Sequence, residues 1–216
     1  MKSDHYFTPH PSASGRRRTL TVTLRGHSFR FATAAGVFSR GRVDRGTRLL
    51  IEHLEVRPAD RLLDLGCGYG VIGIVAGRLA PRGRVFLVDT NTVAVELAAE
   101  NIRINGLTNA VARQGDGFAP VSRQTFDVIA FNPPLRAGLP LVYRLIEQAK
   151  DRLSPSGRFY LVARTRQGAA RLAEKMRHVF GAVDEVAKAG GYRVYLSRRQ
   201  SRCGSDQKGS QCAKNP

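Results

Sequence analysis

A glycine-rich turn between an expected strand and an expected helix constrains the fold more than any other part of this 216-residue chain. Residues 64–70 read DLGCGYG, after an apolar run at 61–65 that predicts a buried strand and before one at 71–79 that predicts a helix. Glycines at such a turn let the backbone bend sharply and approach a ligand, because no Cβ stands in the way. Val71 stands where the fingerprint GxGxxG of dinucleotide-binding proteins requires its third glycine, so a nicotinamide dehydrogenase is the least favoured function.

Strand and helix patterns alternate through the rest of the chain and set the fold class. We predict an N-terminal hairpin at 19–24 and 27–32, further strands at 84–88, 111–114, 126–131, 159–163, 183–187 and 192–196, and helices at 47–54, 92–104, 139–153 and 167–180. This alternation favours an α/β, Rossmann-like sheet of seven mostly parallel strands with helices on both faces. A Gly-Gly turn at 190–191 predicts a closing hairpin and therefore an antiparallel edge strand.

The charge of the chain favours a polyanionic partner. The chain has 35 Lys and Arg residues against 17 Asp and Glu, a formal net charge of +18. Its length suits one domain, which we place at 19–198. We expect a basic segment at 1–18 and a disordered basic tail at 199–216, because both ends carry a surplus of basic residues and the tail is poor in apolar ones.

Membrane, secretory and metal-dependent classes are disfavoured. The most apolar stretch, 71–77, stops at Arg78, well short of the roughly 18 residues that a membrane span needs. Residues 1–18 contain no apolar core of a secretory signal. The cysteines, Cys67, Cys203 and Cys212, and the five histidines have no disulfide or metal-ligand spacing. We therefore expect a cytoplasmic location, no metal and no membrane partner.

Two acidic residues follow strands where such a sheet binds its ligands, outside the carboxyl ends of the strands. Asp89 ends the strand after the glycine turn, 23 residues beyond Gly66, and its carboxylate can accept hydrogen bonds from both hydroxyls of a ribose. Asp116 lies between Gly115 and Gly117 after the next strand, and it can accept from an adenine amino group or simply belong to a turn.

The sequence Asn132-Pro133-Pro134-Leu135 follows the strongly predicted strand at 126–131. Two prolines fix the backbone and remove two hydrogen-bond donors, which leaves the Asn132 side-chain oxygen and a nearby carbonyl as fixed acceptors. Such a pair suits an exocyclic NH2 group, because it holds both hydrogens and aims the nitrogen lone pair outward. The sequence is also typical of a plain turn, so its position in the sheet decides its interpretation.

Together these features resemble the class I methyltransferases that use S-adenosylmethionine and methylate amino nitrogens. The wider similarity is to the methyltransferase small domain group, which includes small-subunit ribosomal RNA guanine-N2 methyltransferases and single-domain relatives. It covers about residues 5–198 and includes the segments HYF at 5–7, GVFS at 36–39, Asp44 with GT at 46–47, and GGYRV at 190–194. The resemblance implies S-adenosylmethionine as cofactor and RNA, ribosomal RNA or the small ribosomal subunit, as partner.

The resemblance also implies roles for individual residues. The expected cofactor-binding residues are Asp64 near the amino group, Gly66, Gly68 and Gly70 along the methionine part, Asp89 at the ribose, Asp116 and Gly117 at the adenine, and Phe38 and Ser39 closing the pocket. The expected catalytic residues are Asn132, Pro133 and Pro134, which would present the target amine.

One departure from the family pattern affects the substrate. Many relatives have an aromatic residue after the two prolines that stacks on a flipped base, a contact of about 1–3 kcal/mol, whereas this chain has Leu135. Leu135 and Arg136 are the expected substrate-binding residues, with Arg136 on a phosphate or the base. Guanine N2 of small-subunit ribosomal RNA is the favoured target. Adenine N6, a protein glutamine amide, and a non-catalytic basic RNA-binding scaffold of the same fold stay open.

Overall fold

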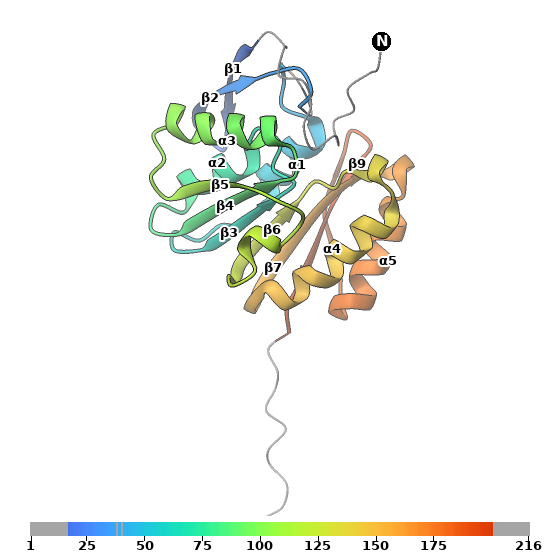
Figure 1. The fold of residues 1–216 in the computed structure, drawn as a ribbon. Coiled ribbons are helices and arrows are strands. Elements are labelled where there is room, and N and C mark those ends of the chain that lie inside the picture. Colours follow the sequence, from blue (N-terminus) through green and yellow to red (C-terminus); the bar gives the residue numbers. More distant parts are fainter. Residues whose placement is uncertain (1–16, 38, 40, 201–216) are drawn as a thin grey trace, which may run out of the picture.

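The computed structural model describes residues 17–37, 39 and 41–200. Its central sheet has seven strands in the order β5-β4-β3-β6-β7-β9-β8 (Figure 1). These strands are β3 (Arg61–Leu65), β4 (Arg84–Asp89), β5 (Ala110–Gln114), β6 (Phe126–Phe131), β7 (Leu153–Arg164), β8 (Asp184–Ala189) and β9 (Tyr192–Arg198). Strands β3 to β7 pair in parallel, and β9 pairs antiparallel with both β7 and β8.

The predicted fold class is confirmed, and the structure adds where the reversed strand lies. Because β9 pairs with β7, the closing hairpin leaves β8 on the edge of the sheet, antiparallel to its only neighbour. Strand β7 begins directly after the preceding helix. Residues 154–157 have the sequence Ser-Pro-Ser-Gly, which is typical of a turn. They nevertheless lie within the bounds of β7, as an irregularity between the pairs Phe126–Leu153 and Val128–Arg158.

Helices cover both faces of the sheet (Figure 1). They are α1 (Arg45–His53), α2 (Val71–Leu79), α3 (Thr92–Ile104), α4 (Leu139–Arg152) and α5 (Ala169–Phe180). Side chains alternate between two cores along each strand: in β4, Val85 and Leu87 pack with α1, α2 and α3, whereas Phe86 and Val88 pack with α4 and α5. Short 3-10 turns, η1 (Ala119–Val121), η2 (Leu135–Ala137) and η3 (Thr165–Gln167), follow β5, β6 and β7.

The predicted N-terminal hairpin, β1 (Arg18–Leu24) and β2 (His27–Thr33), forms a separate two-stranded sheet beside α3. Two asparagine side chains four positions apart hold it there: Asn101 within α3 and Asn105 at its C-cap. Buried Asn101 accepts from the backbone NH of Ala32 at 2.6 Å and donates to its carbonyl at 2.9 Å, and Asn105 makes the same pair of bonds with Arg30. These amides therefore satisfy backbone groups along the edge of β2.

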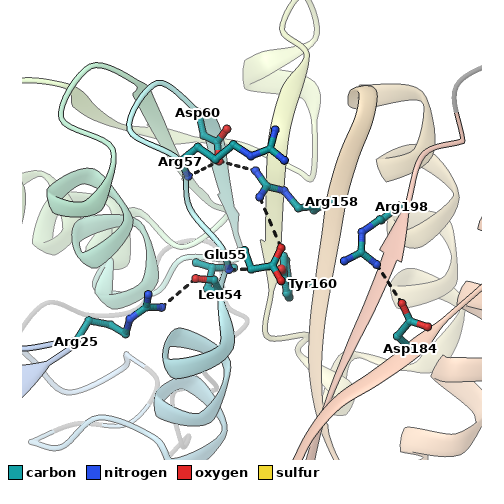
Figure 2. Close-up of polar contacts among 9 residues, drawn as sticks. All are labelled: Arg25, Leu54, Glu55, Arg57, Asp60, Arg158, Tyr160, Asp184 and Arg198. Atoms are coloured by element: carbon teal, nitrogen blue, oxygen red, sulfur yellow. Dashed lines mark hydrogen bonds and ion pairs between the residues drawn. The ribbon is translucent and has the colours of Figure 1, made fainter.

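At the amino ends of the strands, a buried ion pair joins segments from both halves of the sheet (Figure 2). Arg158, only 5% exposed, lies 2.5 Å from Asp60 and 3.9 Å from Glu55. Asp60 also accepts from the backbone NH of Arg57 at 2.7 Å, so its charge is paired and hydrogen-bonded, as a buried carboxylate requires.

The expected basic segment at 1–18 and tail at 199–216 lie almost wholly outside the described residues. Within the described part of the chain, no helix combines the length and apolar character that crossing a membrane requires.

Candidate functional site

A cavity of about 1010 Å³ opens at the carboxyl ends of β3, β4, β6 and β7. Most of the residues singled out in the sequence line it together, although they come from distant parts of the chain. These are Ser39, Gly66, Gly68, Asp89, Asp116, Gly117, Asn132, Pro133, Pro134, Leu135 and Arg136. Asp64 and Gly70 are not among its lining residues. Phe38 lies outside the described residues, while its neighbour Ser39 has a φ of +60° and donates from Oγ to the carbonyl of Arg42 at 2.8 Å.

The glycine turn requires glycine for two different reasons. Gly66 and Gly70 both have left-handed φ angles, +67° and +94°. A Cβ on Gly70 would lie 2.8 Å from Leu87, so this residue allows α2 to pack closely on β4. A Cβ on Gly66 would meet only the ring of Phe131, at 3.9 Å, on the side of the cavity. Gly66 therefore leaves space at the cavity wall, whereas Gly70 serves packing behind it.

Asp89 is held firmly where the cavity meets the end of β4. One carboxylate oxygen accepts from the NH of Gly68 at 2.8 Å, and the other accepts from the NH of Asn91 at 2.9 Å. These two bonds fix the orientation of the carboxylate at the end of β4. The Gly68 bond also ties the glycine turn to β4.

Asp64 is a buried carboxyl group behind the glycine turn. It is 1% exposed; Oδ2 accepts from the NH of Gly73 at 2.8 Å, whereas Oδ1 has no hydrogen-bond partner among the described residues. Burial raises the pKa of Asp64 to about 7, the Gly73 bond opposes the shift, and the charge of Asp89 adds to it. The carboxylate form is thus costly here unless a cation or donor comes close.

Asp116 and Gly117 lie at the other side of the cavity, after β5. Asp116 is exposed and forms an ion pair with Arg144 at 3.0 Å. Gly117 has a φ of +53°, and a Cβ there would lie 2.6 Å from Leu145 of α4. The loop therefore packs closely on α4 while its residues line the cavity.

The Asn-Pro-Pro segment places an amide at the end of β6 with its nitrogen already bonded. Asn132 donates from Nδ2 to Oγ1 of Thr47 at 2.9 Å, and within the described chain its Oδ1 accepts no hydrogen bond. Pro134, with φ −75° and ψ 73°, forms a tight turn in which the NH of Leu135 donates to the carbonyl of Pro133 at 2.9 Å. The amide oxygen, an acceptor, is therefore left for a ligand.

Comparison with known proteins assigns the chain to a family. Residues 28–196 match the family described as Methyltransferase small domain. The chain belongs to the methyltransferase small domain family. It is 38% identical over 199 residues to the uncharacterized protein YbxB of Bacillus subtilis, covering 91% of this chain and 99% of that protein.

Two further similar proteins are longer than this chain. Ribosomal RNA small subunit methyltransferase C of Stutzerimonas stutzeri is 35% identical over 193 residues, which cover 88% of this chain and 57% of that protein. Among solved structures, the 16S rRNA N2 methyltransferase RsmC of T. thermophilus, in complex with AdoMet and guanosine, matches with a TM-score of 0.77 and 28% identity. That match covers 85% of this chain and 51% of RsmC, so the chain spans about half the length of these relatives.

Four further cavity residues of this methyltransferase small domain were not assigned a role from the sequence. Arg164 donates from Nε to the hydroxyl of Tyr192 at 2.8 Å, and Tyr192 donates to Oδ1 of Asp44 at 3.0 Å. Oδ2 of Asp44 accepts from the NH groups of Gly46 and Thr47 at the start of α1, at 2.8 and 3.1 Å. In the sequence, only the family resemblance, which includes the segments around Asp44 and Tyr192, pointed to these residues.

Arginines surround the cavity, and we call Arg42, Arg45, Arg136, Arg164 and Arg166 the arginine rim. They line the cavity or lie within two residues of a lining residue, and all are exposed. Within 17–37, 39 and 41–200, none of the five forms an ion pair with a carboxylate. The described part of the cavity mouth therefore carries five guanidinium groups that form no ion pair with a carboxylate.

Proposed function

We propose that this protein transfers a methyl group from S-adenosylmethionine to an exocyclic amine of RNA, guanine N2 of small-subunit ribosomal RNA. The observation that carries the proposal is the Asn132 amide, whose nitrogen is held by Thr47 and whose oxygen is left as an acceptor in the cavity of the glycine turn and Asp89. A ribosomal substrate also implies a cytoplasmic location.

The residues present fit the cofactor. When bound, S-adenosylmethionine supplies a methyl group on a positively charged sulfonium sulfur. Gly66 and Gly68 would face its methionine part, where the space beside Gly66 is open. Asp89 would accept from the ribose hydroxyls, and Asp116 and Gly117 would lie at the adenine. Ser39 and, from the resemblance, Phe38 would close the pocket.

Asp64 supports the same assignment from behind the glycine turn. Oδ1 of Asp64 has no partner among the described residues, and burial raises the pKa of this carboxyl group. A nearby positive charge would therefore stabilise the carboxylate form, and the cofactor's amino group and sulfonium would provide that charge. Gly70 would contribute indirectly, because it lets α2 approach β4 and so shapes the turn.

The chain's own contribution to the reaction is to hold and orient an amine. The amide oxygen of Asn132 and the carbonyl of Pro133, which keeps a lone pair beside its bond to Leu135, would accept the two N–H hydrogens and leave the nitrogen lone pair directed at the methyl group. The same oxygens favour the positive charge that develops on the nitrogen. A general base is not required beforehand, because the methylated nitrogen is acidic and loses its proton late.

An RNA substrate is supported by the charge at the cavity mouth. The arginine rim offers donors to phosphates, and the net charge of +18 acts in the same direction. A paired base cannot reach the cavity, so the target nucleotide must be unpaired or flipped, at a cost of a few kcal/mol. Leu135 and Arg136, in η2 beside the amide, would contact that nucleotide. RsmC, in complex with guanosine, is the relative that favours guanine.

The test is to incubate the protein with radiolabelled S-adenosylmethionine and either small ribosomal subunits or protein-free ribosomal RNA, and to identify the labelled nucleoside by mass spectrometry. N2-methylguanosine supports the proposal. N6-methyladenosine or a labelled glutamine would contradict guanine N2 as the target and would assign the methyl transfer to that amine. Cofactor binding in calorimetry without transfer to RNA or protein would contradict the enzymatic proposal and favour a non-catalytic scaffold.

A further inference from the structure

The amide at position 132 can act in the proposed reaction in only one of its two orientations. The oxygen and nitrogen ends of an asparagine amide have nearly the same shape but opposite hydrogen-bonding character. The oxygen accepts from an amine, whereas the NH2 end would place donors against the donors of the amine. Something must therefore hold the NH2 end away from the substrate. This inference rests on the proposed function, since it concerns how the proposed acceptor is oriented.

Thr47 is placed to hold that end. Its Oγ1 lies 2.9 Å from Nδ2 of Asn132, although the two residues are 85 positions apart in the sequence and lie on different elements. Thr47 is 7% exposed, so few waters compete for the bond. Both residues line the cavity.

The position of Thr47 is itself fixed by the start of α1 and by β9. Asp44 caps the helix by accepting from the NH groups of Gly46 and Thr47, and the Tyr192 hydroxyl donates to the other oxygen of Asp44 at 3.0 Å. The ring of Tyr192 lies so close to Gly46 that a Cβ there would come within 2.6 Å of it. The motif of Asp44, Gly46 and Thr47 thus has a structural reason at each position.

We infer that Thr47 is a positioning residue, whose hydroxyl oxygen binds the NH2 end of Asn132 so that the amide oxygen faces the target amine. A hydroxyl can donate as well as accept, so the reversed amide is the arrangement that the experiment must exclude. Thr47 touches neither reacting atom and acts through Asn132.

The experiment compares Thr47→Val, which keeps the shape and removes the hydroxyl, with Thr47→Ser, which keeps the hydroxyl. We expect Thr47→Val to lower kcat by about tenfold, the scale of one hydrogen bond, with unchanged S-adenosylmethionine affinity in calorimetry. Thr47→Ser should restore most of kcat. In an Asn132→Ala background, Thr47→Val should have no further effect. A further tenfold loss there would show that Thr47 acts by another route and overturn the inference.

A second readout needs no activity. In the protein labelled with ¹⁵N-asparagine, the side-chain NH2 signal of Asn132, identified by its loss in Asn132→Ala, should exchange slowly with solvent in the wild type and in Thr47→Ser but quickly in Thr47→Val. Equal exchange in all three folded variants would mean that the NH2 end does not bind Thr47, and would overturn the inference. A wild type that methylates no amine would contradict the proposed function instead, and the exchange measurement alone would decide the orientation of the amide.

Discussion

The two ends of the central sheet use arginine in opposite ways. At the amino ends of the strands, three arginines are matched by protein groups. Arg158 is paired with Asp60 and Arg198 with Asp184 at 3.1 Å (Figure 2). Arg25 donates to two backbone carbonyls at the end of α1. At the carboxyl ends, the arginine rim has no carboxylate partner in the described part of the chain.

The difference shows that the net charge of the chain does not reveal which arginines stabilise the fold and which are available to bind a polyanion. A buried charge must be paired within the protein, since leaving it unpaired costs several kcal/mol. An exposed guanidinium is solvated and stays available for a polyanion. Loss of an arginine should therefore reduce stability at one end of the sheet and RNA binding at the other.

The largest expected effect is at the amino end. Arg158→Ala leaves Asp60 buried without its counter-charge and should lower the free energy of unfolding by about 3–5 kcal/mol, measured by urea denaturation. Arg198→Ala, which breaks the exposed pair with Asp184, is the matched control and should change stability little. Equal stability of the two variants would contradict the distinction between buried and exposed pairs.

A second prediction concerns Asp64, a buried carboxyl group at the carboxyl ends of the strands, for which the described residues supply no counter-charge. Its pKa rises from 3.8 in the unfolded chain to about 7 in the folded protein, so folding is penalised progressively as pH rises through that window. Asp64→Asn removes the penalty. Without cofactor, it should be the more stable form above pH 7, by a few kcal/mol, with the advantage shrinking toward pH 4. A pH-independent difference between the two melting curves would rule out the raised pKa.

Asn132→Ala separates chemistry from binding at the carboxyl end. Methyl transfer should fall by at least about tenfold, while S-adenosylmethionine affinity in calorimetry stays nearly the same, because the amide contacts the target amine and not the cofactor. Unchanged turnover would exclude the amide from holding the amine.

The smallest expected effects are those of single rim arginines. Arg136→Ala and Arg166→Ala should each weaken RNA binding a few-fold, and each lost phosphate contact should reduce the salt slope of single-strand binding by about 0.7. Arg198→Ala removes the same charge from the other end and serves as control. If it weakens RNA binding equally, binding follows net charge and not the arginine rim.

Much of the fold followed from local pattern. Strand β6 and helices α2 and α4 have long apolar faces, and their predicted bounds lie within a residue of those observed. Strand β7 starts six residues before its predicted start, because 154–157 has the sequence of a turn and only pairing with β6 brings it into the strand. Helix α1 begins two residues early because Asp44 caps it, a contact that periodicity does not report.

In the candidate site, too, some residues could be identified from local sequence and others could not. Residues directly after strands, such as Asp89 and Asn132, could be chosen from the sequence because the carboxyl ends of parallel strands meet at one edge. The contacts of Thr47 and Tyr192 could not, since nothing local to α1 or β9 shows that Thr47 meets the end of β6 or that Tyr192 meets the start of α1.

The sequence by itself determined the alternation of strands and helices, the glycine turn and the acceptor-rich Asn-Pro-Pro segment, because these depend on neighbours along the chain. Only the tertiary structure decided which end of the Asn132 amide is bound and which arginines of the described chain lack a carboxylate partner. Both depend on contacts between residues tens of positions apart, as between Thr47 and Asn132 or between Asp60 and Arg158, and packing alone brings such residues together.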